Sequence, residues 1–197
     1  MKKIMMSLLL AAAVLSGCKT QESAGNAQSA LDVIMTRTSI RAYTGDPVSK
    51  EQLETILKAG MAAPTAMNGQ PWRFVAVTDK AKIQEVFGGG FRSEMFDNAA
   101  AVILVCGQTV SDGRPNMFWY EDCSAAAENI LLAAHALGLG AVWTAGYPAE
   151  ERTAPIAAAL GIPSDVSILC VIPMGVPAED PEPKDKWKPE NIHWDKW

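Results

Sequence analysis

The chain has 197 residues, which is enough for one domain of ordinary size. Its 17 Lys and Arg and 22 Asp and Glu give a net charge of −5, which excludes a broad basic surface for nucleic acid. Hydrophobic residues make up 49% of the chain and charged residues 20%, so a packed core is expected and general disorder is excluded. Two histidines and four cysteines without a CxxC pair argue against a metal site.

The first 17 residues predict a bacterial lipoprotein signal peptide. Two lysines precede an apolar run, Ile4 to Leu15, that is too short to span a bilayer as a helix. The stretch Leu15-Ser16-Gly17-Cys18 resembles the lipobox of bacterial lipoproteins, which implies cleavage before Cys18 and acylation of its thiol. Ordinary secretion with an unmodified Cys18 is the alternative.

The remaining chain divides into a tether and a domain. Residues 18–29 are polar, small and aperiodic, so we expect a flexible tether that holds the domain off a membrane. Residues 30–197 contain no repeat and no further linker, so we expect one folded domain there. The lipobox resemblance implies that this domain lies in the bacterial cell envelope, on the periplasmic or outer-membrane side.

The first half of the domain predicts helices and one strand. Residues 30–36 place apolar side chains on one helical face. Ser49 and Gln52 form a capping box that opens a helix ending at Met61. Residues 72–78 alternate as a strand does, and Asp79 then caps a short helix that ends at the glycines 88–90.

The second half predicts buried elements. Residues 101–107 form a continuous apolar run, typical of a strand buried on both faces. Residues 120–137 predict an alanine-rich helix that is apolar nearly all round, which belongs in a core or a dimer interface. Strands at 141–145 and 166–173, and a helix at 150–160 that Pro155 breaks, complete the pattern. Helices mixed with few strands indicate an α+β domain.

The tail, residues 176–197, is rich in proline and carries three tryptophans, Trp187, Trp194 and Trp197. A tail with so many aromatic side chains would expose much apolar surface if it were loose. We therefore expect it to wrap a partner subunit, which would bury these rings.

Three clusters carry candidate chemistry. The first is Arg37-Thr38-Ser39-Ile40-Arg41, where two guanidinium groups with hydroxyls between them suit a phosphate dianion. Taken alone, such a run is more commonly a solvated basic turn.

The second cluster is the loop from Pro64 to Trp72, which holds Thr65, Asn68 and Gln70. Asn68 and Gln70 are two residues apart, so an extended chain points both amides the same way. Paired amides can donate and accept together, as a flat heterocycle with imide edges requires. A turn whose amides cap backbone groups is the alternative.

The third cluster is Trp143-Thr144-Ala145-Gly146 at the end of an expected strand. A small residue followed by glycine lets backbone N–H groups approach a ligand ring closely. By itself this pattern could be an ordinary turn.

Together, in this order and spacing, the clusters resemble the FMN-dependent nitroreductase family. The resemblance covers nearly all of residues 31–197 and includes Gly138-Leu139-Gly140-Ala141-Val142-Trp143 and the basic tail. It implies an α+β fold with a small, mostly antiparallel central sheet flanked by helices, in an intertwined homodimer that exchanges its C-terminal tails.

The resemblance also implies roles for single residues. Arg37, Thr38, Ser39 and Arg41 would hold the FMN phosphate and ribityl chain. The loop would reach across from the partner subunit and contact the flavin through Pro64, Thr65, Asn68 and Gln70. Thr144, Ala145 and Gly146 would lie beside the ring, with the backbone N–H of Ala145 or Gly146 facing flavin N5. Lys184 and Lys186 stand where family tails return a basic pair to the phosphate.

The chain departs from the family pattern at three points. Lys186 stands where an arginine is more usual, which keeps the charge but loses the bidentate fork. Thr144-Ala145 provides no carboxylate near N5. The segment between Phe91 and Trp119 is short where relatives often carry a helical insertion over the substrate, so we expect an open pocket.

Other reactive side chains have plainer explanations. His135 is expected to bond a carbonyl in a core or interface, and Cys106 and Cys170 to be inert in buried strands. Cys123 begins a helix and could be more reactive, but it has no partner base. Three acids of the long helix are expected to be exposed: Glu121, Asp122 and Glu128. Phe91, Phe118 and Trp119 could line the flavin's open face, although core packing is the more common role.

The resemblance implies an FMN-dependent oxidoreductase that passes electrons by a ping-pong route to a flat, electron-poor acceptor such as a nitroaromatic or a quinone. No side chain need act as acid or base, so no catalytic residue is named. NAD(P)H is cytosolic, so export favours two alternatives. One is another flavin reaction on the same fold, such as reductive dehalogenation or enone reduction, and the other is a flavin-binding lipoprotein without turnover.

Overall fold

The computed structural model describes residues 29–89 and 93–197. The signal peptide, most of the tether with Cys18, and Phe91 lie outside the described residues, so what the sequence predicts for them stays a prediction. Among the described residues, no helix is both long enough and apolar enough to span a bilayer.

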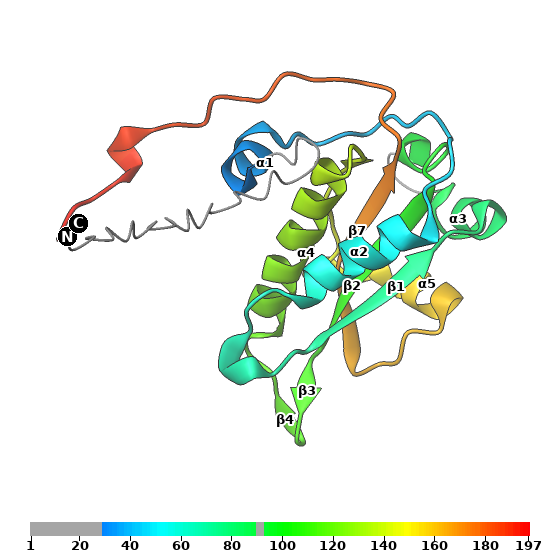
Figure 1. The fold of residues 1–197 in the computed structure, drawn as a ribbon. Coiled ribbons are helices and arrows are strands. Elements are labelled where there is room, and N and C mark those ends of the chain that lie inside the picture. The colour runs from blue at the N-terminus through cyan, green and yellow to red at the C-terminus, as the bar shows by residue number, and fades with distance from the viewer. Residues whose placement is uncertain (1–28, 90–92) are drawn as a thin grey trace, which may run out of the picture.

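A central antiparallel sheet organises the domain (Figure 1). Its strands are β1 (Trp72–Val77), β2 (Ala101–Gln108), β7 (Val166–Gly175), β5 (Gly140–Ala141) and β6 (Thr144–Ala145). They follow the order β1-β2-β7-β5, and β6 also pairs with β7. A separate hairpin joins β3 (Val110–Ser111) to β4 (Arg114–Pro115). The predicted α+β fold with an antiparallel sheet flanked by helices is confirmed.

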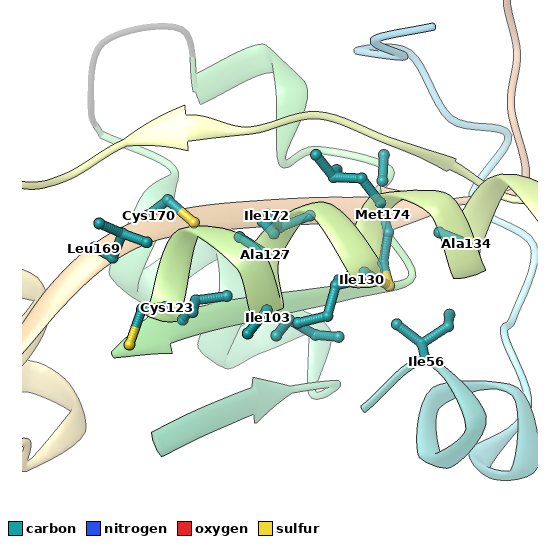
Figure 2. Packing of buried hydrophobic residues seen from close by; sticks show 14 of the residues in the cluster. Ile56, Ile103, Cys123, Ala127, Ile130, Ala134, Leu169, Cys170, Ile172 and Met174 are labelled. Carbon is teal, nitrogen blue, oxygen red and sulfur yellow. The ribbon is translucent and has the colours of Figure 1, made fainter. Parts of the chain in front are cut away.

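One face of the sheet carries α4 (Trp119–Ala136), with α2 (Lys50–Met61) packed against it (Figure 1). Figure 2 shows Ile130 of α4 among Ile103 of β2, Met174 of β7 and Ile56 of α2. All four are at most 1% exposed. The two helices approach closely at Gly60, where a Cβ would lie 2.9 Å from Ile130 Cγ1.

The opposite face packs against α3 (Lys80–Phe87) and α5 (Glu150–Leu160). Strand β2 lies between the two layers, and its residues Ala101 to Gly107 are buried as predicted. A fully apolar strand fits this place because both of its faces meet side chains rather than water.

Local signals set the starts of the helices. The Ser49 hydroxyl accepts the Gln52 N–H at 3.1 Å, and the Gln52 amide accepts the Ser49 N–H at 3.0 Å, which confirms the predicted capping box. Asp79 caps α3 in the predicted way. The helix α1 (Ala30–Thr36) also begins with a capping box, formed by Ser29 and Asp32, which the sequence analysis did not predict.

Two predicted elements differ in the structure. The strand expected at 141–145 is two short pairings, β5 and β6, separated by Val142 and Trp143. The helix α5 runs through Pro155 without a break. A single proline removes one backbone hydrogen bond, and the packing of Ile156 against the core keeps the following turn in place.

The tail leaves the body after a short pairing with residues 42–44. Thr44 N–H donates to Val176 O at 3.0 Å, and Ala178 N–H donates to Ala42 O at 2.9 Å. Beyond this pairing the tail runs extended past α1 and away from the sheet (Figure 1). In the single chain its tryptophans are 70%, 81% and 98% exposed, in chain order, so the expected wrapping of a partner stays a prediction.

Candidate functional site

The basic run, residues 37–41, lies between α1 and the sheet, beside the C-terminal half of α4. Thr36 Oγ1 is 2.9 Å from His135 Nε2, and Ile40 N–H donates to Ala141 O at 3.1 Å. Arg37 Nε is 3.6 Å from the carboxylate of Glu128, which is exposed as predicted. The run is therefore tied to both α4 and β5.

The third cluster and Arg41 share one cavity. This cavity has a volume of about 870 Å³, within the usual range for ligand sites. Arg41 lines it together with the four residues from Trp143 to Gly146. The remaining wall comes largely from apolar residues of α3 and α5, including Val86 and Ile156. The structure thus brings Arg41 of the first cluster to the third cluster, whereas Arg37, Thr38 and Ser39 do not line this cavity.

Backbone geometry decides which N–H group of the third cluster can reach a ligand. Gly146 N–H donates to Leu169 O at 2.9 Å, so it is used inside the sheet. Ala145, the residue before Gly146, lies opposite Cys170 in the antiparallel ladder. Because N–H groups alternate in direction along such a strand, the Ala145 N–H points away from β7. Of the two expected donors, Ala145 is therefore available.

Gly146 and Thr144 both contact the neighbouring strand β7. A Cβ at Gly146 would lie 2.7 Å from Ile168 O, so the close backbone approach here is to β7, not to a ligand as expected. The Thr144 hydroxyl donates to Val171 O at 2.6 Å, which directs it to the sheet. Both residues fix the edge from which Ala145 presents its amide.

The loop from Pro64 to Gln70 is turned, not extended as predicted. It contains a short 3₁₀ helix, Ala66–Asn68, and its φ angles are 56° at Asn68 and 47° at Gln70. The Gln70 amide donates to Asn68 Oδ1 at 2.8 Å, so the two side chains meet through this turn. Pro64, Asn68 and Gln70 are exposed and Thr65 is partly buried.

The loop is held by an acid that was expected to be exposed. Asp122 is only 7% exposed, and its Oδ1 accepts the Ala66 N–H at 2.8 Å. The prediction for Asp122 is wrong because the loop covers the first turn of α4. Glu121, the preceding residue, is exposed as predicted.

The loop and the basic run lie at opposite ends of α4 (Figure 1). Asp122 holds the loop near the start of the helix, and His135 contacts Thr36 near its end. These two residues are thirteen positions apart, or about 20 Å along a helix that rises 1.5 Å per residue. The Arg37 side chain reaches back along the helix to Glu128, but no residue of the loop lines the cavity that holds Arg41.

The tail lysines do not line the cavity. Lys184 and Lys186 are both exposed on the extended tail. Upstream of them, Glu179 accepts hydrogen bonds from the backbone N–H groups of Arg41 and Ala42, the latter at 3.1 Å. Sequence analysis missed Glu179, since no local pattern marks an acid that bonds to a segment more than a hundred residues away.

The three described cysteines are unsuited to nucleophilic chemistry. Burial raises the pKa of the Cys106 and Cys123 thiols to about 12, and it raises the pKa of Cys170 still further. Cys123 is fully buried and donates to Cys106 O, so the reactivity considered for it is wrong. Inert thiols at 106 and 170 agree with the prediction.

The predictions for Trp119, Phe118 and His135 have different outcomes. Trp119 is buried in the core, where its ring meets that of Tyr147 edge-on with centroids 4.9 Å apart. Phe118 is 40% exposed, and it does not line the cavity. His135 contacts a hydroxyl rather than the expected carbonyl, and burial together with Arg37 lowers its pKa.

A flavin fits the cavity on chemical grounds. Its largely apolar walls suit a flat ring system, and the Ala145 N–H is a donor at one edge. The Arg41 guanidinium supplies positive charge for a polar edge or an anionic chain. The site therefore belongs to the class that binds a ring-bearing anionic cofactor.

The comparisons with known proteins agree with this class. The chain belongs to the nitroreductase family, whose sequence model matches residues 34–89 and 85–176. A protein from Archaeoglobus fulgidus is 42% identical over 170 residues, covering 85% of this chain and 98% of the relative. A crystal structure from Bacteroides thetaiotaomicron is 43% identical with a TM-score of 0.80, covering 88% of this chain and 99% of that one. Both bear the name "Putative NADH dehydrogenase/NAD(P)H nitroreductase".

A third similar protein concerns the cofactor directly. It is a "putative nitroreductase in complex with fmn" from Desulfovibrio desulfuricans, 31% identical with a TM-score of 0.75. The alignment covers 86% of this chain and 98% of that one. The chain is thus an FMN-dependent oxidoreductase of the nitroreductase family.

Proposed function

We propose that two copies of the chain form a homodimer that binds FMN between them, takes electrons from NAD(P)H in vitro and passes them to small, flat, electron-poor acceptors. Nitroaromatics and quinones are the acceptor classes with this chemistry. The observation that carries the proposal is the single cavity that joins Arg41 to the outward amide of Ala145.

FMN supplies the hydride-accepting ring, and the protein supplies orientation and charge. The Ala145 N–H, which points away from β7, would donate to a ring nitrogen, and the Arg41 guanidinium would meet the anionic chain of the cofactor. The apolar side chains of Val86, Phe87 and Ile156 would cover one side of the ring, beside the charged Glu85 and Arg152. The short connection before α4 leaves the other side open to a second substrate, which favours a ping-pong order.

The anionic end of the cofactor needs more than one cation. Arg37, Thr38 and Ser39 continue from Arg41 along the same run and offer charge, hydroxyls and backbone donors. Lys184 and Lys186 would complete the neutralisation if the tail of either subunit returned to this point. Their spacing of two residues places both on one side of an extended chain.

Two features favour a dimer. The loop with Thr65, Asn68 and Gln70 contributes no residue to the cavity that Arg41 of the same chain lines. Both can reach one flavin most simply if the loop comes from a second copy. The α1 side chains Leu31, Ile34 and Met35 are also 69%, 53% and 74% exposed, an apolar face that a partner would cover.

The test is an FMN titration of the purified chain combined with its mass in solution and its steady-state kinetics. We expect a dimer with one FMN per chain, and parallel double-reciprocal lines when NADPH and a nitroaromatic are varied together. A monomer that binds FMN tightly would contradict the shared site. Intersecting lines would contradict the ping-pong order.

We further propose that Cys18 is acylated and anchors the domain to a membrane of the bacterial cell envelope. The support is the lipobox-like sequence before Cys18 and the polar stretch behind it. We expect Cys18→Ser to move the protein out of the membrane fraction of its host. A membrane-bound Cys18→Ser variant would contradict the anchor.

A further inference from the structure

The loop from Pro64 to Gln70 has a strained backbone. Met67, Asn68 and Gln70 have φ angles of 51°, 56° and 47°, in the left-handed region. Asparagine tolerates this region, whereas methionine and glutamine rarely adopt it. Strain of this kind persists only where surrounding contacts hold the backbone in place.

The bonds within the loop are local and exposed. The Gln70 amide meets Asn68, and Gln70 N–H lies 3.3 Å from the Thr65 hydroxyl. Arg73, three residues further on, donates to Gln70 O at 3.3 Å. Water competes with each of these bonds, so they hold the turn weakly.

Asp122 holds the loop from the body of the protein. Its carboxylate accepts the Ala66 N–H at 2.8 Å, from a residue that is only 7% exposed. A buried, charge-assisted hydrogen bond is stronger than a neutral bond at the surface. Asp122 lies in the first turn and a half of α4, where unpaired helix N–H groups also favour a carboxylate.

We propose that Asp122 is a positioning residue for FMN binding: it fixes the Ala66 amide so that Asn68 and Gln70 meet the flavin held by the other subunit. The inference rests on the proposed function, because it assigns the loop to a flavin contact across the dimer. It adds a residue that touches neither FMN nor acceptor. Asp122 acts through the shape of the loop.

The first experiment measures FMN affinity and turnover in three full-length variants. Asp122→Ala removes the acceptor, Asp122→Asn keeps a neutral acceptor of the same shape, and Glu121→Ala removes the neighbouring exposed acid. We expect the Asp122→Ala variant to bind FMN about tenfold more weakly, Asp122→Asn to lie between it and the wild type, and Glu121→Ala to match the wild type. Wild-type affinity and turnover in Asp122→Ala would overturn the proposal.

The second experiment separates positioning from general loss of stability. Asp122→Ala and Arg41→Ala chains are unfolded, mixed in equal amounts and refolded together. In a mixed dimer, the basic run of the first chain meets the loop of the second, which rebuilds one intact site. Half of the dimers are then mixed, so we expect about a quarter of wild-type activity, above the mean of the two parents. A mixture no more active than that mean would overturn the proposal.

The parents and the wild type show which claim fails. A fully active Arg41→Ala parent would contradict the proposed role of Arg41. A monomeric wild type would contradict the shared site. If neither occurs and the mixture still fails to recover, Asp122 acts within its own subunit and the inference is wrong.

Discussion

Glu179 accepts a hydrogen bond from the backbone N–H of Arg41 through the same oxygen that lies 3.1 Å from the amide nitrogen of Ala42. Among the described residues, no hydrogen bond or ion pair joins the body to the tail beyond Glu179, where the exposed stretch with Lys184 and Lys186 follows. One carboxylate thus links the basic run to the segment that carries the other cations.

Replacing Glu179 should loosen this link. In Glu179→Ala we expect the amide hydrogens of Arg41 and Ala42 to exchange with solvent about tenfold faster, because each loses its acceptor. Hydrogen exchange followed by mass spectrometry or NMR measures the rates. Glu182→Ala, at an exposed position on the same tail, should leave them unchanged. Equal protection in Glu179→Ala would show that the bond does not hold the tail.

Arg41 is expected to matter for cofactor retention. Arg41→Ala removes a guanidinium from the cavity wall, and charge-assisted bonds of this kind contribute more than neutral ones. We expect FMN affinity to fall by about tenfold or more, measured by equilibrium dialysis. Arg114→Ala, on the exposed β4, is the matched control. Unchanged affinity in Arg41→Ala would contradict the assignment.

The two tail lysines predict a salt effect. If Lys184 and Lys186 neutralise the FMN phosphate, affinity in the wild type should weaken as ionic strength rises, because exposed charges are screened. The double variant Lys184→Gln/Lys186→Gln should bind FMN more weakly at low salt and show a flatter dependence. FMN titrations at several salt concentrations measure how steeply the affinity falls with ionic strength. Identical slopes in the wild type and the double variant would show that the two lysines do not lie near the phosphate.

His135 predicts a loss of stability in acid. Burial and the nearby Arg37 lower its pKa below the ordinary value of 6.5. The unfolded chain therefore takes up the proton at a higher pH than the folded chain does, so its contribution is complete above pH 6.5 and declines as the pH falls below it. We expect His135→Gln, which can still bond Thr36, to reduce this decline in the thermal-unfolding midpoint. Parallel pH profiles would contradict the assignment.

Patterns that act over one helical turn or one strand could be predicted from the sequence. The capping box at Ser49 and the buried run of β2 are of this kind, and both have the expected boundaries within a residue. The family resemblance also assigns the Arg37–Arg41 run and the Trp143–Gly146 cluster to one site. In the structure, Arg41 and the latter cluster line the same cavity.

Contacts between distant segments could not be predicted. Glu179 reaches Ala42 and Asp122 reaches Ala66 across the fold, and no local pattern records either bond. One signal for Asp122 was present: it lies four and eight residues before the buried Ala126 and Ile130, on the same helical face. An acid on an apolar face is a candidate for a buried role, and this spacing would have separated Asp122 from Glu121.

The left-handed turn of the loop had no sequence signal either. The two-residue spacing of Asn68 and Gln70 suits an extended pair or a turn, and Gly69 between them, the usual marker of positive φ, has a φ of −70°. The structure instead places positive φ at Met67, Asn68 and Gln70, where a tertiary bond and not residue preference decides the conformation.

The central claim is that this chain uses FMN to pass electrons from NAD(P)H to a separate acceptor. The most direct measurement is the visible absorbance of the FMN-loaded protein under anaerobic conditions, first after NADPH and then after a nitroaromatic. The account predicts that the flavin absorbance bleaches with NADPH and recovers when the acceptor is added. Bound FMN that NADPH leaves unchanged, or that does not recover with nitroaromatic or quinone acceptors, would contradict it.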